Sequence, residues 1–313
     1  MLFRSTEKLA TLIVSTNNLI QEGTVSTTGP QTIIACGSSV TLCGNYNLTG
    51  EANFIADGDV TLSCNTSVST ELGVIQFTGT VDGAHDLSLS AGGNDVTFVG
   101  VVGGSTRIGN LTIENTNNVT AFASISAESI TGNMTGDSSF AALNTTEGIS
   151  LEGRAVTFSG EVETGGSGPC AVINGGTLTV SADMNIAGAF TQSGGGDVLL
   201  RGDIIAEGVS IQNSVSLTGD ASLDGGGSDV FLSGPVNGAY ALSTNSATYT
   251  TFEGAIGGTS ALSSLTTNGE GNLKIGNVAT TEAQNYSNAG VTLKGTVYTT
   301  TDADFNKIGR AHV

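Results

Sequence analysis

Three Gly-rich phrases contain the residues whose type and spacing come nearest to a metal site. Each phrase passes through an aspartate into an apolar run: GGNDVTF (92–98), GGGDVLL (194–200) and GGGSDVFL (225–232). Calcium-binding β-rolls repeat such a nonapeptide in tandem, so that aspartates of adjacent turns share each ion. Here Asp95, Asp197 and Asp229 are widely and unequally spaced, so the phrase does not repeat in tandem. We therefore favour plain Gly-Asp turns, with a calcium-stabilised β-roll as an alternative.

Carboxylates would have to cluster if the chain cleaved polysaccharides, because such enzymes place paired acids, or Lys and Arg, on one face. The acidic pairs are instead scattered through predicted turns: Asp57 and Asp59, Glu161 and Glu163, Asp302 and Asp304. Arg107, Arg154 and Arg201 recur at equal intervals, and we interpret them as solvated side chains. A carbohydrate-active enzyme thus remains only the alternative hypothesis.

A histidine general base or nucleophile triad would have to be built on His85, in DGAHDLSLS. An internal repeat places Tyr240 at the matching position, so packing or solvation explains a bulky residue beside this turn. We predict no catalytic residue, no cofactor-binding residue and no metal ligand, and hence no enzyme.

The four cysteines, Cys36, Cys43, Cys64 and Cys170, show no C-x-x-C spacing and so no zinc or redox motif. The interval from Cys43 to Cys64 is close to one coil of the repeat described below. They could therefore stack in neighbouring layers. We favour buried free cysteines that act as small hydrophobic residues over a disulfide, and the pairing stays open.

The net charge narrows the class of partner. Nine Lys and Arg against 28 Asp and Glu give a formal charge of −19, which argues against nucleic acid, polyanionic glycans and anionic membranes. The charge is explained by solubility of a long β surface. The first residues hold only a short apolar run, Leu9–Val14, so we expect neither a signal peptide nor membrane insertion by this segment.

Short strands must position these residues. GISLEGRAVTFSGEV (148–162), GTLTVSADMNIAG (176–188) and SVSLTGDASLDG (214–225) alternate apolar and polar residues and break at Gly, Asn or Asp. This period of two is typical of strands with one buried face. Helical signals are nearly absent, since Gly is 46 of 313 residues, yet 38% of residues are hydrophobic and can form a thin core.

Longer phrases repeat in register over 9–31, 81–113 and 236–295. VDGAHDLSLS (81–90) matches VNGAYALSTN (236–245), and GTVSTTGPQT (23–32) matches GNVATTEAQN (276–285). Many short strands that repeat without helices predict an all-β solenoid rather than a β-sandwich. We estimate about 22 residues per coil and about 14 coils, which would form one elongated rod on the order of 65 Å long.

The ends of the chain carry two further predictions. Arg4 and Ser5 fall where the other copies have Gly103–Gly104 and Gly257–Gly258, so Met1 lies inside a repeat and the chain is a segment of a longer protein. We assign residues 1–307 to one solenoid. The last six residues, IGRAHV (308–313), match the translation of a common sequencing adapter, and we interpret them as an artefact, with a disordered tail as the alternative. Arg310 and His312 then carry no functional weight.

The order of phrases resembles a known family. GAFTQSGGGDVLLRGDI, SVSLTGDASLDGGGSDVFLSGPVNGAYALS and TFEGAIGGTSALSSLTTNG are similar to the repeat region of filamentous-haemagglutinin-like large exoproteins, which are bacterial adhesins secreted by two-partner or autotransporter routes. The resemblance covers nearly the whole chain except its last six residues. It implies a right-handed parallel β-helix and carries over no catalytic residue.

The same resemblance implies a function and a location. It implies a stalk-like segment of an adhesin, secreted or displayed on the surface of a Gram-negative-type bacterium. The implied partners are a receptor or glycan on a host or neighbouring cell and an outer-membrane secretion partner.

Overall fold

The computed structural model describes residues 12–16, 19–22, 25–27, 31–35 and 40–300. They form an all-β structure of parallel strands, in which stacked coils make a β-solenoid of about 13 turns. The predicted parallel solenoid is confirmed, with about one coil fewer than estimated. Among the described residues, no helix is long and apolar enough to cross a membrane.

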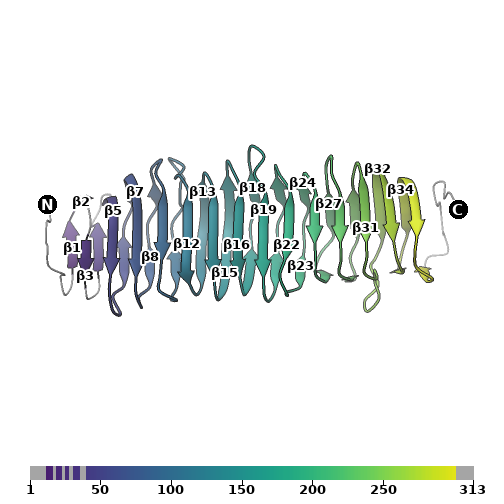
Figure 1. The fold of residues 1–313 in the computed structure, drawn as a ribbon, viewed down its shortest axis with the longest axis horizontal. Coiled ribbons are helices and arrows are strands. Elements are labelled where there is room, and N and C mark those ends of the chain that lie inside the picture. Colours follow the sequence, from purple (N-terminus) through teal and green to yellow (C-terminus); the bar gives the residue numbers. More distant parts are fainter. Residues whose placement is uncertain (1–11, 17–18, 23–24, 28–30, 36–39, 301–313) are drawn as a thin grey trace. The chain divides into compact units, whose positions relative to one another are not determined.

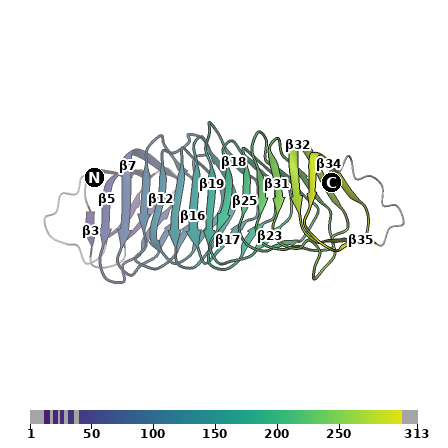
Figure 2. The ribbon, with the colours of Figure 1, turned by 45° about the vertical axis from the view of Figure 1, so that its right-hand side comes forward.

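The chain divides into two compact units, Met1–Arg154 and Ala155–Val313. Within each unit, Figure 1 shows successive coils lying side by side, and the turned view in Figure 2 shows strands on more than one face of the stack.

Strands of unit 1 are long where one strand continues around a corner of the coil. The nine-residue β13 and β15, for example, pair along their length with a register shift between Ala121 and Ser124. The strands are β1 (Leu12–Thr16), β2 (Leu19–Glu22), β3 (Val25–Thr27), β4 (Gln31–Ala35), β5 (Val40–Leu48), β6 (Phe54–Asp57), β7 (Val60–Thr70), β8 (Ile75–Phe77), β9 (Val81–Asp82), β10 (Leu87–Ser90), β11 (Val96–Phe98), β12 (Leu111–Thr116), β13 (Val119–Ala127), β14 (Ile130–Met134), β15 (Asp137–Thr145) and β16 (Ile149–Gly153).

Strands of unit 2 are shorter, and three of them complete most coils. Through most of the unit each strand pairs in parallel with the third strand after it, as in β19 with β22 and β22 with β25. The strands are β17 (Ala155–Phe158), β18 (Val162–Thr164), β19 (Cys170–Asn174), β20 (Leu178–Val180), β21 (Met184–Ile186), β22 (Phe190–Ser193), β23 (Val198–Leu200), β24 (Ile204–Ala206), β25 (Val209–Ile211), β26 (Val215–Leu217), β27 (Ala221–Asp224), β28 (Val230–Leu232), β29 (Val236–Asn237), β30 (Leu242–Asn245), β31 (Tyr249–Phe252), β32 (Leu265–Ile275), β33 (Val278–Thr280), β34 (Gln284–Leu293) and β35 (Tyr298–Thr300).

Coil length varies while the inward face is kept. The coil that runs from Val198 to its partner Val215 is much shorter than the coil that runs from Leu87 to its partner Leu111. The turns differ in length, so each strand still pairs in parallel with the strand on the same side of the neighbouring coil. This is how apolar residues stay inside without a constant repeat length.

The core is a thin stack of aliphatic and aromatic side chains. In β11, Val96 and Phe98 are fully buried, and Thr97 between them is only partly so, as the alternation predicts. In unit 1 the ring of Phe77 stacks on that of Phe98, with centroids 5.5 Å apart, and lies 5.7 Å from the ring of Phe54. Neighbouring coils are thus in contact through their buried aromatic side chains as well as through backbone hydrogen bonds.

The repeated phrase forms the same structure in both units. Gly103 and Gly257 have φ of 70° and 71°, a conformation that favours glycine. A Cβ on either would lie about 2 Å from a carbonyl oxygen of the next coil. Ile108 and Leu262, two residues in register, both form isolated parallel bridges to the next coil. The repeat between 81–113 and 236–265 is therefore structural, whereas Leu9, Arg4, Ser5 and residues 308–313 lie outside the described residues.

Candidate functional site

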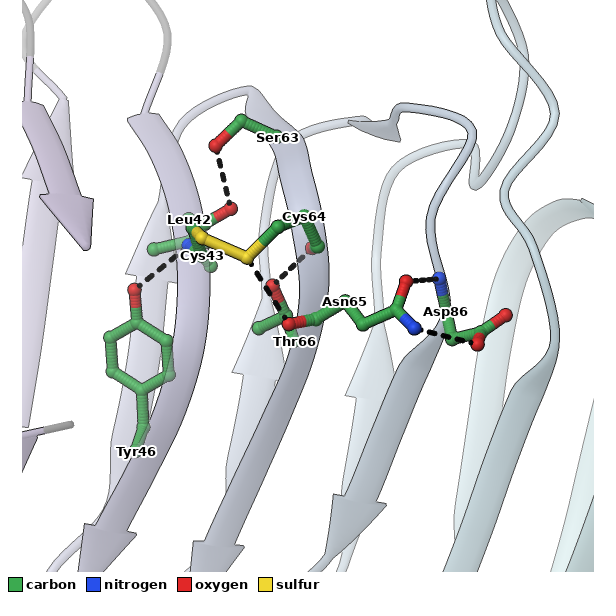
Figure 3. The surroundings of a disulfide bond; sticks show 8 residues. All are labelled: Leu42, Cys43, Tyr46, Ser63, Cys64, Asn65, Thr66 and Asp86. Atoms are coloured by element: carbon green, nitrogen blue, oxygen red, sulfur yellow. Dashed lines mark hydrogen bonds between the residues drawn. A yellow bond between two sulfur atoms is a disulfide. The ribbon is translucent and has the colours of Figure 1, made fainter. Parts of the chain in front are cut away.

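The polar residues that could do chemistry lie at the turns, where they connect one coil to the next. Asn65 and Asp86 form a reciprocal pair: the Asp86 N–H donates to Asn65 Oδ1 at 3.1 Å, and Asn65 Nδ2 donates to Asp86 Oδ2 at 3.0 Å (Figure 3). Asp86 Oδ1 in turn accepts from the N–H of Asn110 at 2.8 Å, and Asn110 Oδ1 accepts from Ser129 Oγ at 2.6 Å. We call Asn65, Asp86, Asn110 and Ser129 the Asx ladder.

The same contact recurs at other turns of both units. In each case a side-chain oxygen of one coil accepts a backbone N–H from the start of a strand or turn in the next coil. Outside the Asx ladder, the accepting residues are Asn53, Asp59, Asp82, Asp95 and Asn118 in unit 1, and Asp183, Asp220, Asp229, Asn237 and Asn277 in unit 2. These bonds satisfy backbone donors that the strand ladder leaves over.

The aspartates of the Gly-rich phrases take part in these contacts. Asp95 Oδ1 accepts from the N–H and Nδ2 of Asn118 at 3.1 and 2.9 Å, and Asp229 Oδ1 accepts from the N–H of Tyr249 at 3.1 Å. Asp197 contributes its backbone oxygen, which accepts from the N–H of Leu178 at 2.9 Å. Across residues 40–300 and the four short described strands before them, no three His, Cys, Asp or Glu side chains are grouped to hold a metal ion.

Of the predicted carboxylate pairs, Asp57 and Asp59 each accept hydrogen bonds from a different threonine of the next coil. Asp57 Oδ1 accepts from Thr78 Oγ1 at 2.7 Å, and Asp59 Oδ1 accepts from the N–H and Oγ1 of Thr80, both at 2.9 Å. Of the second pair, Glu161 is exposed and Glu163 half-buried, and the pair Asp302 and Asp304 lies outside the described residues.

His85 lies in the turn before β10 and its side chain is half-buried. Its backbone oxygen accepts from the N–H of Gly109 at 2.9 Å. The matching Tyr240 uses its backbone oxygen in the same way, accepting from the N–H of Ser263 at 3.0 Å. Both positions thus use main-chain atoms, so the residue type there is not constrained by this contact.

The interpretation of the arginines as solvated is wrong for Arg107. Its Nη1 donates to the backbone oxygens of Ala127 at 2.9 Å and Asn144 at 2.7 Å, so the side chain spans two further coils. Arg154 forms an exposed ion pair with Asp137, and Arg201 is exposed.

Cys43 and Cys64 form a disulfide, which corrects our preference for free cysteines at these positions. Their Cα atoms are 4.9 Å apart, and the bond joins β5 to β7, the stacked strands of neighbouring coils (Figure 3). The register of the two strands shifts between Leu42 and Gly44, which places the two cysteines beside each other. Cys170, by contrast, is a buried free thiol, as expected.

A buried tyrosine accepts a hydrogen bond from the main chain at one of the disulfide cysteines. The Cys43 N–H donates to the hydroxyl of Tyr46 at 3.4 Å, and the Tyr46 side chain is fully buried. Burial raises the pKa of Tyr46 to about 12, and the Cys43 hydrogen bond offsets part of that rise. The hydroxyl therefore stays neutral at any physiological pH.

Sequence reasoning missed a buried amide cluster in unit 2. Gln192 Nε2 donates to Asn174 Oδ1 at 2.7 Å, and Gln192 Oε1 accepts from the N–H of Gln212 at 3.2 Å. Asn174 and Gln192 are 0% and 1% exposed. The sequences CAVIN (170–174) and FTQS (190–193) each place an amide side chain at an inward position of a strand, which indicates a buried polar residue. The sequence does not show that the two amides bind each other, because that depends on how the coils stack.

Two shallow surface hollows, each of about 300 Å³, lie in unit 2. One follows the outward hydroxyls of Ser222, Ser243 and Thr266, with Asp203 at its edge. The other lies over Gly254, Gly276 and Gly295, between Glu253 and Lys294.

We compared the chain with protein-family models, curated proteins and solved structures, and none of them matched.

Proposed function

We propose that this chain is a structural stalk segment of a bacterial adhesin of the filamentous-haemagglutinin-like kind. The supporting observation is that the turn carboxylates and amides accept backbone N–H groups of the following coil. Side chains such as Asp86 and Asp95 thereby stabilise coil stacking and do not converge on a substrate position. An extended repeat built in this way presents surface without needing a catalytic centre.

The disulfide favours an oxidising location. Disulfides persist in secreted and surface proteins and are rare in the reducing cytosol of mesophiles. With the sequence resemblance, the Cys43–Cys64 bond supports a segment that is secreted or displayed on a Gram-negative-type cell surface. The partners we propose are a receptor or glycan on a host or neighbouring cell and an outer-membrane protein that exports the chain.

A stalk requires interchangeable coils, which a matched pair of variants tests. Val198 pairs with Val215, so an in-register deletion of 198–214 brings Val215 into the place of Val198 with every inward residue still inward. The control variant carries the same deletion together with Val215→Asp, which keeps the register but places a carboxylate in the core. Far-UV circular dichroism and thermal melting of both purified variants supply the measurement.

We expect the in-register deletion to keep the β spectrum and to melt close to the temperature of the parent chain. The deletion that also carries Val215→Asp should lose cooperative melting, because Val215 is buried. Unfolding of both variants would contradict interchangeable coils. Turnover of an acidic or neutral polysaccharide by the parent chain, abolished by Asp203→Asn, would favour the enzyme alternative. A melting temperature that falls when calcium is chelated would favour the β-roll.

A further inference from the structure

One turn of unit 2 is shorter than the same turn in the coils on either side. Thr251, Lys274 and Thr292 are partners in three successive coils, and so are Ile256, Val278 and Tyr298. The connecting segments hold four residues (252–255), three residues (275–277) and five residues (293–297). The middle turn thus recedes between its neighbours.

Glycine at the receding turn leaves the space unfilled. Gly276 carries no side chain, and a Cβ built there would meet nothing nearer than the Gly254 oxygen at 3.9 Å. The result is the hollow of about 300 Å³ that lies over Gly254, Gly276 and Gly295. The flanking turns contribute Glu253 on one side and Lys294 on the other.

Lys294 lines this hollow, and a second lysine, Lys274, lies next to it on the strand of the preceding coil. Lys294 is exposed and Lys274 half-buried, and Lys274 is the strand partner of Thr292, two residues before Lys294. The nearby Lys274 ammonium, together with slight desolvation, lowers the pKa of Lys294, while Glu253 opposes this shift. Like charges so close are costly without a counter-charge.

The proximity of Lys274 and Lys294 is notable because the described residues contain few positively charged side chains. Residues 40–300 contain five Lys or Arg in a chain of formal charge −19, and two of the five adjoin here. Lys294 and Glu253 line the hollow and Lys274 lies beside it, which gives two positive groups and one negative group in this region. That balance suits one anionic group and disfavours a polyanion.

The remaining lining is polar. Asn277 Oδ1 accepts from the N–H groups of Thr296 and Val297 at 2.8 and 3.1 Å, which leaves the Asn277 amide nitrogen to donate to a ligand. Thr296 adds a hydroxyl at the rim. A hydrophilic ligand fits such a lining better than an apolar one.

We propose that the hollow over Gly276 binds a single carboxylate or sulfate group of a small hydrophilic ligand, such as an acidic monosaccharide unit, through Lys274 and Lys294. An anion between the two ammonium groups replaces their repulsion with two attractive contacts. The site adds ligand recognition to a segment proposed above only as a stalk, and it does not depend on that role.

The corresponding turns of unit 1 lack each of these features. Gln76, Thr97 and Thr120 are partners there in the way that Thr251, Lys274 and Thr292 are, and four residues separate each from Val81, Val102 or Ile125; the last three of the four form the turn. The turns are TGT, VGV and FAS, with no cation. Because these turns are of equal length, none of the three recedes between its neighbours, and we therefore connect the site with the short turn of unit 2.

Isothermal titration of the purified chain at constant ionic strength tests the site, with sodium sulfate, glucuronate and uncharged glucose as probes. One variant, Lys274→Gln with Lys294→Gln, removes the cations, and Gly276→Leu fills the hollow while keeping them. Arg201→Gln is the matched control, because it removes an exposed cation elsewhere in unit 2. Circular dichroism checks that each variant is folded.

We expect saturable binding of sulfate or glucuronate to the parent chain and to Arg201→Gln, and at least tenfold weaker binding to the double lysine variant and to Gly276→Leu. Glucuronate alone would identify a sugar acid as the ligand class, and sulfate binding equally well would identify the free anion as sufficient. Absence of saturable binding, equal binding of glucose, or an equal loss in Arg201→Gln would overturn the proposal. If Gly276→Leu does not fold, the lysine variant decides.

Discussion

Asp82 and Asn237 end the equivalent strands β9 and β29 of the two units, and each accepts from two backbone donors at matching positions of the following turn. Asp82 Oδ1 accepts from the N–H groups of Ser105 and Thr106 at 2.8 and 3.0 Å. Asn237 Oδ1 accepts from the corresponding N–H groups, those of Thr259 and Ser260, at 2.9 and 3.4 Å. The turn therefore needs an acceptor oxygen at this position and not a charge.

Substitutions of Asp82 separate these two requirements. Asp82→Asn should leave the protection of the Ser105 and Thr106 amides against hydrogen exchange near the parent level. Asp82→Ala removes the acceptor and should lower the local opening free energy by about 1 kcal/mol. If the asparagine variant lost as much protection as the alanine variant, the negative charge would be the essential feature.

Loss of the disulfide should destabilise unit 1. The bond closes a loop between cysteines at a sequence separation of 21, which corresponds to about 3 kcal/mol in the chain-entropy model. In a Cys36→Ser background, Cys43→Ser with Cys64→Ser should lower the melting temperature as much as a reductant lowers that of the parent. The reductant should have no effect on the double variant. A parent chain indifferent to reductant would show that the bond adds no stability.

Cys170 should be chemically silent in the folded chain. Complete burial raises its pKa to about 12, so the reactive thiolate is scarce at pH 8. A disulfide exchange reagent should label Cys170 only on unfolding, in a background where Cys36 is Ser. Because the folded state holds the proton more tightly, the contribution of Cys170 to stability is complete below pH 9 and is lost between about pH 9 and 12. Rapid labelling of the folded chain at pH 8 would contradict this burial.

Two glycines of one corner should respond in opposite ways to alanine. A Cβ on Gly254 would lie 2.4 Å from the backbone of Gly234, so Gly254→Ala must displace a coil and should cost about 1–3 kcal/mol. Gly276 has open space, and Gly276→Ala should be neutral or stabilise by up to about 1 kcal/mol through the unfolded chain. Urea unfolding compares the pair, and equal costs would contradict the short-turn geometry.

The fold could be predicted because the alternation of apolar and polar residues that defines each strand lies within a few consecutive residues. Alternation in GTLTVSADMNIAG gives β20 and β21, and inward residues such as Leu178 and Val180 are indeed fully buried. The paired repeats predicted the shared turns at Gly103 and Gly257 for the same reason.

The disulfide and the short turn could not be predicted, because both depend on register. Cys43 meets Cys64 only because the register of β5 and β7 shifts beside them. The recess at Gly276 arises from the lengths of the turns stacked on either side, and Arg107 finds Asn144 two coils away. Because coil length changes along the chain, a constant-period estimate cannot identify such cross-coil partners.

The Cys43–Cys64 bond also limits how far the chain can be drawn out by force. Residues between the two sulfur atoms are excluded from the extended contour, which removes roughly 70 Å of reach. Under tension, strands would detach one after another up to the loop closed by the disulfide. The residues inside that loop would not be extended. The extension of the chain under force would thus differ before and after reduction of the disulfide.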